Sequence, residues 1–580
     1  MIFLENITFL NLKKNAKLNM ENLKKYKIAI LGDCSTQHLA TALKGYGYKE
    51  GYNFDIFDSD YNQIDSQIMD DSSELYSHLP DTVLIYMSAE KLYENFCNTN
   101  LEERKNFAEN TIAKINYYWS SINQKIKTNI FQFNFLEIDD RAFGNYGNKI
   151  ENSFIYQLRK LNFKLMELSE NFKNVFLIDI STIQNLYGRE KVHDDKLYYI
   201  AKMPLSTTIL PEVSKQVVDV IKANNGQFKK CVILDLDNTL WGGVIGDDGL
   251  KSIQIGELGL GHAFSEFQMW LKELKLRGIL LAVCSKNNEN IAKEPFEKHP
   301  EMVLRLDDFS IFVANWEDKA SNIKYIQQTL NIGMDSMVFI DDNPFERNLV
   351  KGMIPEITVP DLPEDPAEYL SYLKSLNLFE TASYSENDKD RTKQYQAQAQ
   401  RVSLQSNFEN FDEYLKSLEM KATVSPFQEF DYPRISQLTQ RSNQFNLRTI
   451  RYTEAEIEQI ANDENYLTLS FSLKDKFGDY GLISIVIMEK KDEKTLFITN
   501  WLMSCRVLKR GMEEFIVNKI IETATENGFE KVIGEYIKTQ KNAMVENIYE
   551  KLGFENLGNG KFEVDINKFT PNSTNILSCR

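Results

Sequence analysis

The chain has 580 residues, which is too long for one hydrophobic core, so three or four domains are expected. Its net charge of −17, without a long cluster of lysine and arginine, argues against a nucleic-acid partner. No apolar run approaches the roughly 18 residues that a membrane span needs, so no membrane span is expected.

The six cysteines include no pair at Cys-x-x-Cys spacing, so the sequence indicates neither a zinc site nor a disulfide framework. This usage is typical of reduced thiols in the cytosol. The first 20 residues lack a small-residue cleavage site and predict no signal peptide. We therefore expect a cytoplasmic protein.

Strands alternate with helices over residues 1–220, which predicts a first α/β domain with a parallel sheet. Apolar runs predict buried strands at 28–31, 81–87, 127–135 and 175–179. The helices expected between them cover 36–44, 101–120 and 152–170.

A Gly-Asp-Cys-Ser turn at 32–35 follows the first strand and resembles the first block of the SGNH hydrolase family. In that family a Gly-Asp-Ser turn carries a serine nucleophile, and Cys34 stands at the serine position here. The family's late Asp-x-x-His pair has no match, because His193 has its acids on the wrong side. One interpretation is a hydrolase or a thiol acyl carrier at Cys34. The favoured one is a degenerate domain that kept the fold and lost its triad.

The run Cys231–Leu234 is apolar and predicts a buried strand, with Asp235, Asp237 and Thr239 at its carboxyl end. Open α/β sheets bind ligands outside the carboxyl ends of their strands. Two acids one residue apart face the same side of an extended chain and repel each other unless a cation lies between them. The pattern therefore predicts Mg²⁺ and phosphate chemistry.

Three further strands of this second domain, residues 225–375, lead into polar residues: 279–284 into Ser285, 309–314 into Lys319, and 336–340 into Asp341 and Asp342. This ordered set of strand ends resembles the haloacid dehalogenase (HAD) superfamily of phosphotransferases. The resemblance implies a Rossmann-like parallel sheet. No insert between the first two motifs is large enough for a big cap.

The resemblance assigns a chemical role to each strand end. It implies that Asp235 attacks phosphorus to form an aspartyl-phosphate, and that Asp237 protonates the leaving group and later activates water. It places the phosphoryl oxygens against three residues: Thr239, Ser285 and Lys319. It places Mg²⁺ on four: the side chain of Asp235, the backbone carbonyl of Asp237, and Asp342 with Asp341 beside it.

The segments 240–249, 285–288 and 339–346 are similar to the FkbH-like branch of this superfamily. Members of that branch are associated with making glyceryl thioesters: they take 1,3-bisphosphoglycerate, remove phosphate and pass the glyceryl group to an acyl carrier protein. A thiol intermediate would fit this chemistry, and Cys284 and Cys34 are the candidate acyl carriers. For Cys284 the favoured alternative is a small apolar residue in a buried strand, because neighbouring strand residues point to opposite faces.

Residues 376–420 are charged and glutamine-rich, with a pattern that suits a solvated helical connector. The α+β region at 421–568 resembles the GNAT acyltransferase fold, and the tail at 569–580 reads as disordered. The expected order is strands 467–473, 481–488 and 495–503, helix 511–527, strand 531–536 and helix 542–552.

In the GNAT family an Arg/Gln-x-x-Gly-x-Gly turn opens a helix whose N–H groups bind the pyrophosphate of coenzyme A. Arg506 and Gly511 match this turn, but Lys509 replaces the first glycine, which favours a phosphopantetheine arm over free coenzyme A. Asn542 and Tyr549 are further candidate binding residues, and Tyr549 is either an acid toward a leaving thiolate or a tyrosine packed on the sheet. Possible substrate contacts are Asn443, Gln444 and Asn446.

The sequence thus predicts an Mg²⁺-dependent phosphatase or phosphotransferase of a small phosphorylated substrate, coupled to acyl transfer onto an acyl carrier protein. A second enzymatic alternative is a phosphatase of a sugar or glycan-biosynthesis phosphate, with a vestigial acyltransferase domain. A third alternative is a scaffold that binds a phosphorylated partner without turnover. The intact Asp235 and Asp237 pair argues against the scaffold.

Overall fold

The computed structural model describes residues 7–18, 20–138, 140–384, 389, 391–405, 408, 410–539 and 541–579. The chain divides into two compact units, with the boundary between Lys222 and Ala223. This boundary lies close to the end predicted for the first domain. Across the described residues, no helix combines the length and the apolarity that crossing a membrane requires.

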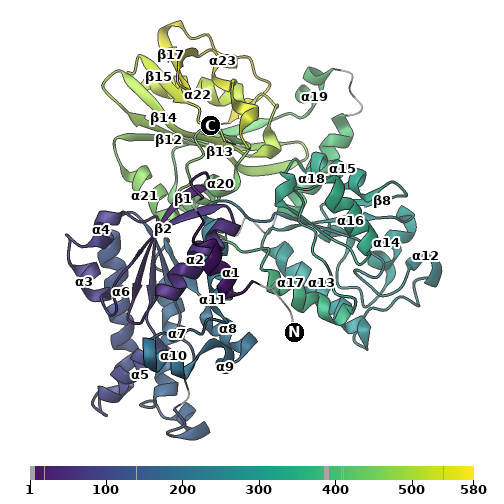
Figure 1. Ribbon diagram of the computed structural model, residues 1–580. Coiled ribbons are helices and arrows are strands. Elements are labelled where there is room, and N and C mark those ends of the chain that lie inside the picture. Colours follow the sequence, from purple (N-terminus) through teal and green to yellow (C-terminus); the bar gives the residue numbers. More distant parts are fainter. Residues whose placement is uncertain are drawn as a thin grey trace. The chain divides into compact units, whose positions relative to one another are not determined.

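The first unit is built on a five-stranded parallel sheet in the order β2-β1-β3-β4-β5 (Figure 1). Its strands are β1 (Lys24–Gly32), β2 (Tyr52–Asp58), β3 (Thr82–Tyr86), β4 (Asn129–Phe133) and β5 (Val175–Ile178). The parallel sheet was predicted, but β2 was not. As an edge strand it is only half buried, and its polar residues hide the continuous apolar run that marked the inner strands.

Helices cover both faces of this sheet, because alternate residues of each strand enter different cores. In β1, Ile28 and Ile30 pack into one cluster and Ala29 and Leu31 into the other. The helices are α1 (Phe9–Asn15), α2 (Gln37–Lys49), α3 (Ile64–Met69), α4 (Glu74–His78), α5 (Ala89–Asn98), α6 (Phe107–Lys125), α7 (Phe154–Ser169), α8 (Ile180–Tyr187), α9 (Arg189–Val192), α10 (Asp195–Ala201) and α11 (Leu210–Asn224).

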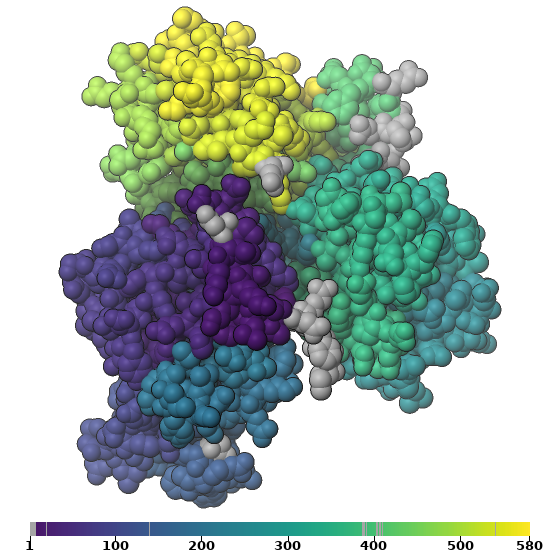
Figure 2. Space-filling model, in the orientation of Figure 1, coloured from purple at the N-terminus to yellow at the C-terminus, as the bar shows by residue number. Residues whose placement is uncertain are grey.

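Helix α1 packs on α2 at a glycine, and the purple N-terminal residues lie on the face shown in Figure 2. A Cβ on Gly45 of α2 would lie 2.1 Å from the carbonyl oxygen of Leu12. We expect Gly45→Ala to lower the free energy of unfolding by about 1–3 kcal/mol, since the two helices must separate. Urea denaturation measures this loss. The control Gly352→Ala, a helical glycine with open space around it, should be neutral or stabilising, and an equal loss in both variants would contradict the packing argument.

The second unit begins with a four-stranded parallel sheet in the order β8-β7-β6-β9. Its strands are β6 (Cys231–Leu234), β7 (Leu280–Ser285), β8 (Ile311–Ala314) and β9 (Met337–Ile340). The helices around it are α12 (Ile245–Asp248), α13 (Leu260–Leu276), α14 (Glu289–Lys298), α15 (Lys319–Leu330), α16 (Pro344–Met353) and α17 (Tyr369–Leu376). Only α12 and α13 lie between β6 and β7, so no large cap domain interrupts the sheet, as predicted.

A second, mixed sheet follows in the order β16-β17-β15-β14-β13-β12-β10-β18, with β11 paired to β14. The strands are β10 (Lys421–Ser425), β11 (Phe445–Asn446), β12 (Tyr466–Asp475), β13 (Gly478–Lys490), β14 (Thr495–Met503), β15 (Lys531–Glu535), β16 (Glu555–Gly558), β17 (Lys561–Asp565) and β18 (Leu577–Cys579). The helices are α20 (Tyr432–Arg441), α21 (Glu454–Asn462), α22 (Met512–Glu526) and α23 (Ile548–Lys551).

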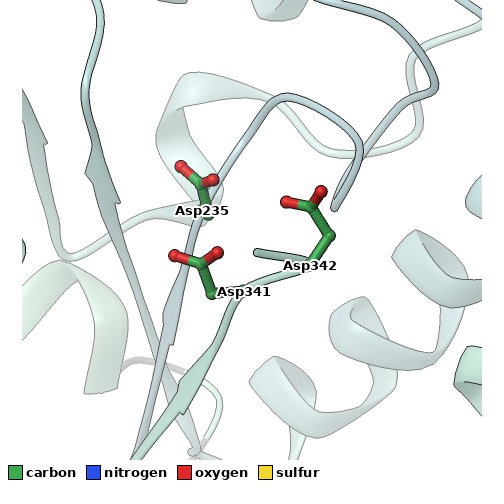
Figure 3. A group of neighbouring side chains, drawn as sticks. All are labelled: Asp235, Asp341 and Asp342. Carbon is green, nitrogen blue, oxygen red and sulfur yellow. The ribbon is translucent and has the colours of Figure 1, made fainter. Parts of the chain in front are cut away.

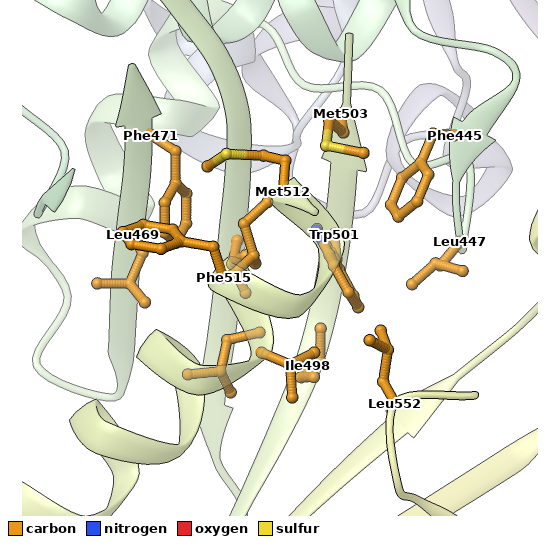
Figure 4. Packing of buried hydrophobic residues seen from close by; sticks show 14 of the residues in the cluster. Phe445, Leu447, Leu469, Phe471, Ile498, Trp501, Met503, Met512, Phe515 and Leu552 are labelled. Carbon is orange, nitrogen blue, oxygen red and sulfur yellow. The ribbon is translucent and has the colours of Figure 1, made fainter. Parts of the chain in front are cut away.

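The core of this region forms where α22 packs on the sheet: Phe515 packs against Phe471, and Trp501 packs against Phe445 (Figure 4). Strands β14 and β15 run parallel and pair only over Thr495–Phe497. Beyond Phe497, β14 extends past β15 and pairs with β11. The mixed α/β multidomain fold class is therefore confirmed. The predicted helix at 542–552 is instead a 3-10 turn, Ala543–Val545, followed by the single turn α23.

The prediction of a disordered tail is wrong. Strand β18 pairs with the edge strand β10, the side chain of Ile576 is buried, and Thr574 Oγ1 donates to the carbonyl oxygen of Gly511. The polar composition of the tail hid this, because its pairing partner lies more than 150 residues earlier in the chain.

The connector contains α18 (Arg391–Gln405) and α19 (Phe411–Ser417), and the expectation of a solvated helix is also wrong. The side chains of Tyr395 and Arg401 are buried in the seam that α18 fills between α15 and β13. Its polar residues find partners there: Gln398 Oε1, for example, accepts from Arg510 at 2.7 Å. Polar spacing predicts exposure only when such partners are lacking.

Candidate active site

The predicted strand ends meet at one edge of the four-stranded sheet. Leu234 of β6 pairs with Ile340 of β9 and Val283 of β7, so Asp235 and Asp341 leave neighbouring strands at the same level. The backbone N–H of Asp235 extends the ladder by donating to the carbonyl oxygen of Ile340 at 3.0 Å. The short parallel strands therefore bring together residues that are about 100 positions apart in the sequence.

Three carboxylates converge at this edge, those of Asp235, Asp341 and Asp342, with one oxygen of each within 4.8 Å of the others (Figure 3). Lys319, at the first turn of α15, bridges two of them: its Nζ lies 2.9 Å from Asp235 and 2.6 Å from Asp341. Lys319, Asp235 and Asp341 are all buried. The cluster therefore holds two acids and one cation away from bulk water, with the half-buried Asp342 beside them.

The electrostatics follow from this burial. Burial, and then the charge of Asp235, raises the pKa of Asp341 to about 7, against the opposing effect of Lys319. Burial and Asp235 also raise the pKa of Asp342. Burial alone would lower the pKa of Lys319, but the carboxylates of Asp235 and Asp341 outweigh it and raise that pKa above its usual value. Negative charge at this edge is in excess and favours a bound cation.

Asp237 is held by hydrogen bonds of its own and is not one of the three clustered acids. One of its carboxylate oxygens accepts from Trp241 Nε1 and from the backbone N–H of Ile245, both at 3.0 Å. The other accepts from Asn287 Nδ2 at 3.1 Å. Burial raises the pKa of Asp237, which favours a carboxyl group able to carry a proton. The turn directly after Asp237 places Asn238 in the left-handed region, with a φ of 56°.

Thr239 fixes the loop after β9. Its hydroxyl accepts from the backbone N–H of Asp342 at 3.1 Å and lies 3.3 Å from the Asp342 carboxylate. Arg347 Nη1 donates to the backbone carbonyl oxygens of Asp341 and Asp342, at 2.8 and 2.6 Å. Sequence reasoning missed both Asn287 and Arg347 as positioning residues. For Asn287 the Ser-Lys-Asn-Asn run was a signal, whereas nothing local marked Arg347.

The residues present fit a magnesium ion. Mg²⁺ prefers carboxylate and carbonyl oxygens in an octahedral shell that keeps several waters. Three carboxylates at this spacing supply oxygens of the right kind, and each is held by a hydrogen bond or an ion pair within the protein. Ser285, buried at the end of β7, lies at the same edge.

Neither cysteine proposed as an acyl carrier is accessible. Cys284 is fully buried, packs into the core on the far face of the sheet and donates from Sγ to the carbonyl oxygen of Lys319 at 3.7 Å. Cys34 is 3% exposed. Burial raises the pKa of both thiols, which disfavours the thiolate. In this conformation neither thiol can accept an acyl group.

Three of the four predicted coenzyme A or pantetheine residues lie in the interior. Arg506 donates to Tyr480 O at 3.3 Å and to Gln394 of α18, and Asn542 is fully buried. Tyr549 packs on Gly534, where a Cβ would lie 2.3 Å from its ring, so the packing alternative describes its environment. Gly511, with a φ of 82°, begins α22 as the turn prediction required.

Comparisons with known proteins agree with this geometry. Residues 27–222 match the family described as FkbH, N-terminal domain. The crystal structure of the N-terminal part of the protein BF1531 from Bacteroides fragilis, containing a phosphatase domain complexed with Mg, is 50% identical, covers 65% of this chain and all of its own, and gives a TM-score of 0.62. A search of curated proteins found no match.

Solved acetyltransferase structures match part of the chain at low identity. The ribosomal-protein-S18-alanine N-acetyltransferase from Escherichia coli is 17% identical over 26% of this chain and 98% of its own, with a TM-score of 0.21. The spermidine N-acetyltransferase from Vibrio cholerae is 16% identical over 26% of this chain and 97% of its own, also at 0.21.

The parallel sheet, its acid-bearing edge and the 50% identity over the whole of that solved N-terminal part, which contains a phosphatase domain, define the chain as an enzyme, a phosphatase of the HAD superfamily. The match of residues 27–222 to the FkbH N-terminal domain then identifies the family within this superfamily. The chain belongs to the FkbH-like family.

Proposed function

We propose that this phosphatase works through an aspartyl-phosphate on Asp235 and that its phosphatase step is coupled to acyl transfer onto an acyl carrier protein. The observation that carries the phosphatase half is the buried cluster in which Lys319 bridges Asp235 and Asp341. Such a cluster has an excess of negative charge that a bound cation would offset, and the cation with Lys319 would then attract a phosphoryl group.

The proposed phosphatase reaction has two steps, formation of the aspartyl-phosphate and its hydrolysis. An oxygen of Asp235 attacks phosphorus, the bond from phosphorus to the leaving oxygen breaks, and Asp237 gives that oxygen its proton. Water then attacks phosphorus, Asp237 takes back a proton, and inorganic phosphate leaves as the aspartyl-phosphate bond breaks. Lys319, Ser285 and Thr239 hold the phosphoryl oxygens. The hydrogen bonds from Trp241, Ile245 and Asn287 keep Asp237 oriented.

Asp235, Asp341, Asp342 and the backbone carbonyl of Asp237 would hold Mg²⁺, the ion bound by the Bacteroides fragilis structure. When bound, the ion offsets the charge of the acids and of the phosphoryl group. The side chains of this chain supply the nucleophile, the proton and the hydrogen bonds.

Metal removal should abolish phosphate release. We expect a chelator to stop the enzyme and added Mg²⁺ to restore it, because three acids, two of them buried, cannot accept a phosphoryl dianion without a compensating cation. Phosphate release from p-nitrophenyl phosphate and from small acyl and sugar phosphates, with and without Mg²⁺, checks this. Full activity in the chelator would contradict the metal assignment.

Two observations support coupling to acyl transfer. The chain belongs to the FkbH-like family, and its mixed sheet carries the turn at Gly511 that begins α22. In the proposed reaction a thiolate attacks the carbonyl carbon of an acyl phosphate, and phosphate leaves as the carbon–oxygen bond breaks. The acyl thioester keeps any phosphate ester elsewhere on the molecule, and Asp235 removes that ester. The thiol proposed is the phosphopantetheine of the carrier protein.

Mass spectrometry of a carrier protein incubated with enzyme, Mg²⁺ and 1,3-bisphosphoglycerate tests the coupling. A glyceryl adduct on the carrier is the expected result. Phosphate release without an adduct would leave the alternative, a phosphatase of sugar or glycan intermediates. The interior positions of Asn542 and Tyr549 favour that alternative, because side chains engaged in packing are not free to bind an acyl donor.

A further inference from the structure

A cavity of about 170 Å³ lies inside the second unit, away from the phosphatase edge. Its walls include Lys230, just before β6, and Asp335 and Ser336, just before β9. These residues precede the strands whose opposite ends carry Asp235 and Asp341. At about 3.3 Å per residue the two ends of β6 are more than about 10 Å apart, so the cavity and the acid cluster are separate sites.

The walls of the cavity are strongly cationic. The positively charged residues that line it come from the phosphatase region, from the connector and from the region of the mixed sheet. They are Lys230, Arg391, Arg434, Arg441, Arg506 and Lys541. Asp335 is the one carboxylate among the described lining residues, and Lys541 pairs with it. The chain as a whole has a net charge of −17, so the positive charge of this cavity is opposite in sign to that of the protein.

The hydrogen bonds shown for two of these cations go to uncharged acceptors. Lys230 Nζ donates to the carbonyl oxygen of Arg441. Arg506 donates to Ser504 Oγ, to Gln394 and to the carbonyl oxygen of Tyr480. Uncharged oxygens solvate a cation but add no negative charge, and Asp335, which also pairs with Lys541, offsets only part of the charge of Lys230.

The pKa of Lys230 reflects that imbalance. Burial, and then the positive charges of Arg391, Arg441 and Arg451, lower it to about 8, while Cys505 opposes them. Arg451 packs behind the cavity wall, and burial lowers its pKa to about 10. A bound anion would reverse the effect and return Lys230 to the fully charged state.

We propose that this cavity binds a small ligand that carries a phosphate group. Clustered guanidinium and ammonium groups are the donors that phosphate oxygens prefer, and Arg506 and Lys230 both line the space. The volume is below the roughly 300 Å³ of drug-sized pockets, so a phosphate with a short organic group fits and a nucleotide does not. Ser442, Asn443 and Gln444 supply polar atoms for the organic part.

This site differs from the turn that begins α22. Of the residues from Arg506 to Met512, only Arg506 lines the cavity. The proposal also does not depend on the proposed function, because it concerns binding and not turnover.

Cys505 lines the cavity and is partly exposed, so it can report occupancy. We expect inorganic phosphate or glycerol phosphate, at millimolar concentration, to slow alkylation of Cys505 by iodoacetamide at least about threefold, and neutral glycerol to have no effect. Peptide mass spectrometry measures the rate at each cysteine. Exposed Cys97 in α5 is the internal control and should react equally in all samples.

Calorimetry with the full chain tests the cations. Lys230→Met should weaken phosphate binding about tenfold or more, and Lys230→Arg should retain it. Lys229→Met, which removes the neighbouring lysine outside the cavity, is the matched control and should bind normally. Binding should weaken as the pH rises through about 8, where Lys230 loses its proton.

The outcomes are distinct. Tighter binding of glycerol phosphate than of inorganic phosphate would identify an organic phosphate as the ligand, and the reverse order would identify the free ion; both support the site. Equal alkylation of Cys505 with and without either phosphate compound would overturn the proposal, even if Lys230→Met does not fold.

Discussion

Asp235→Asn should lower the rate of phosphate release about a thousandfold or more, because an amide oxygen cannot form the acyl phosphate on which both steps depend. The substitution is nearly isosteric, and Asp235 sits in a rigid place: its backbone continues the β6 ladder, and its side chain meets Lys319. The fold should therefore survive the change. Initial rates with p-nitrophenyl phosphate at saturating Mg²⁺ measure the loss.

The matched control is Asp247→Asn, an exposed acid in the flap that follows the same strand and lies outside the acid cluster. It should keep near-normal activity. If Asp235→Asn turned over at a comparable rate, the nucleophile would have to be another residue, and the assignment of Asp235 would fail. Trapping with beryllium fluoride, which mimics the phosphoryl group on a carboxylate, gives a second readout: the unmodified enzyme should bind it and Asp235→Asn should not.

The second large effect concerns stability. Arg401→Met should lower the free energy of unfolding of the second unit by about 3–5 kcal/mol, because it leaves a buried carboxylate without its main counter-charge. Arg401 in α18 makes two bonds of 2.7 Å to Asp475 at the end of β12, and both side chains are almost fully buried. Arg510, at 3.8 Å, and the hydroxyl of Tyr480 remain as partial compensation.

Urea denaturation followed by tryptophan fluorescence checks this prediction. Lys416→Met is the control in the same connector: it breaks the exposed ion pair with Asp412 and should leave the free energy of unfolding almost unchanged. Adding Asp475→Asn to Arg401→Met should recover part of the loss, since the orphaned charge is then removed. A similar small loss for Arg401→Met and Lys416→Met would show that the buried pair does not hold the connector in place.

The acid-bearing edge could be predicted from the sequence because each part of it is local. A strand, the acid that follows it and the parallel pairing rule together place Asp235, Lys319 and Asp341 at one edge. The partners that orient these residues could not be predicted in this way. Asn287 donates a hydrogen bond to Asp237, which lies 50 positions earlier in the sequence. Arg347 donates to a backbone oxygen, and a pattern of side chains does not reveal such a partner.

The connector and the tail show a different limit. Periodicity reports whether a segment is polar, and a polar segment was interpreted as solvated. The polar side chains of α18 instead make hydrogen bonds with Arg506, Arg510 and Asp475 of the region that contains the mixed sheet. The tail pairs with an edge strand of that sheet. Burial of polar groups depends on long-range partners, which a single sequence does not reveal.

The pairing of β18 with β10 has a consequence for association between chains. A sheet edge presents unpaired N–H and C=O groups to any other extended chain, and natural proteins protect such edges to avoid aggregation. Here the last strand lies on that edge over only three residues, Leu577–Cys579. An edge that short offers little length for a second molecule to extend, so β18 helps to protect β10 from pairing with the sheets of neighbouring molecules.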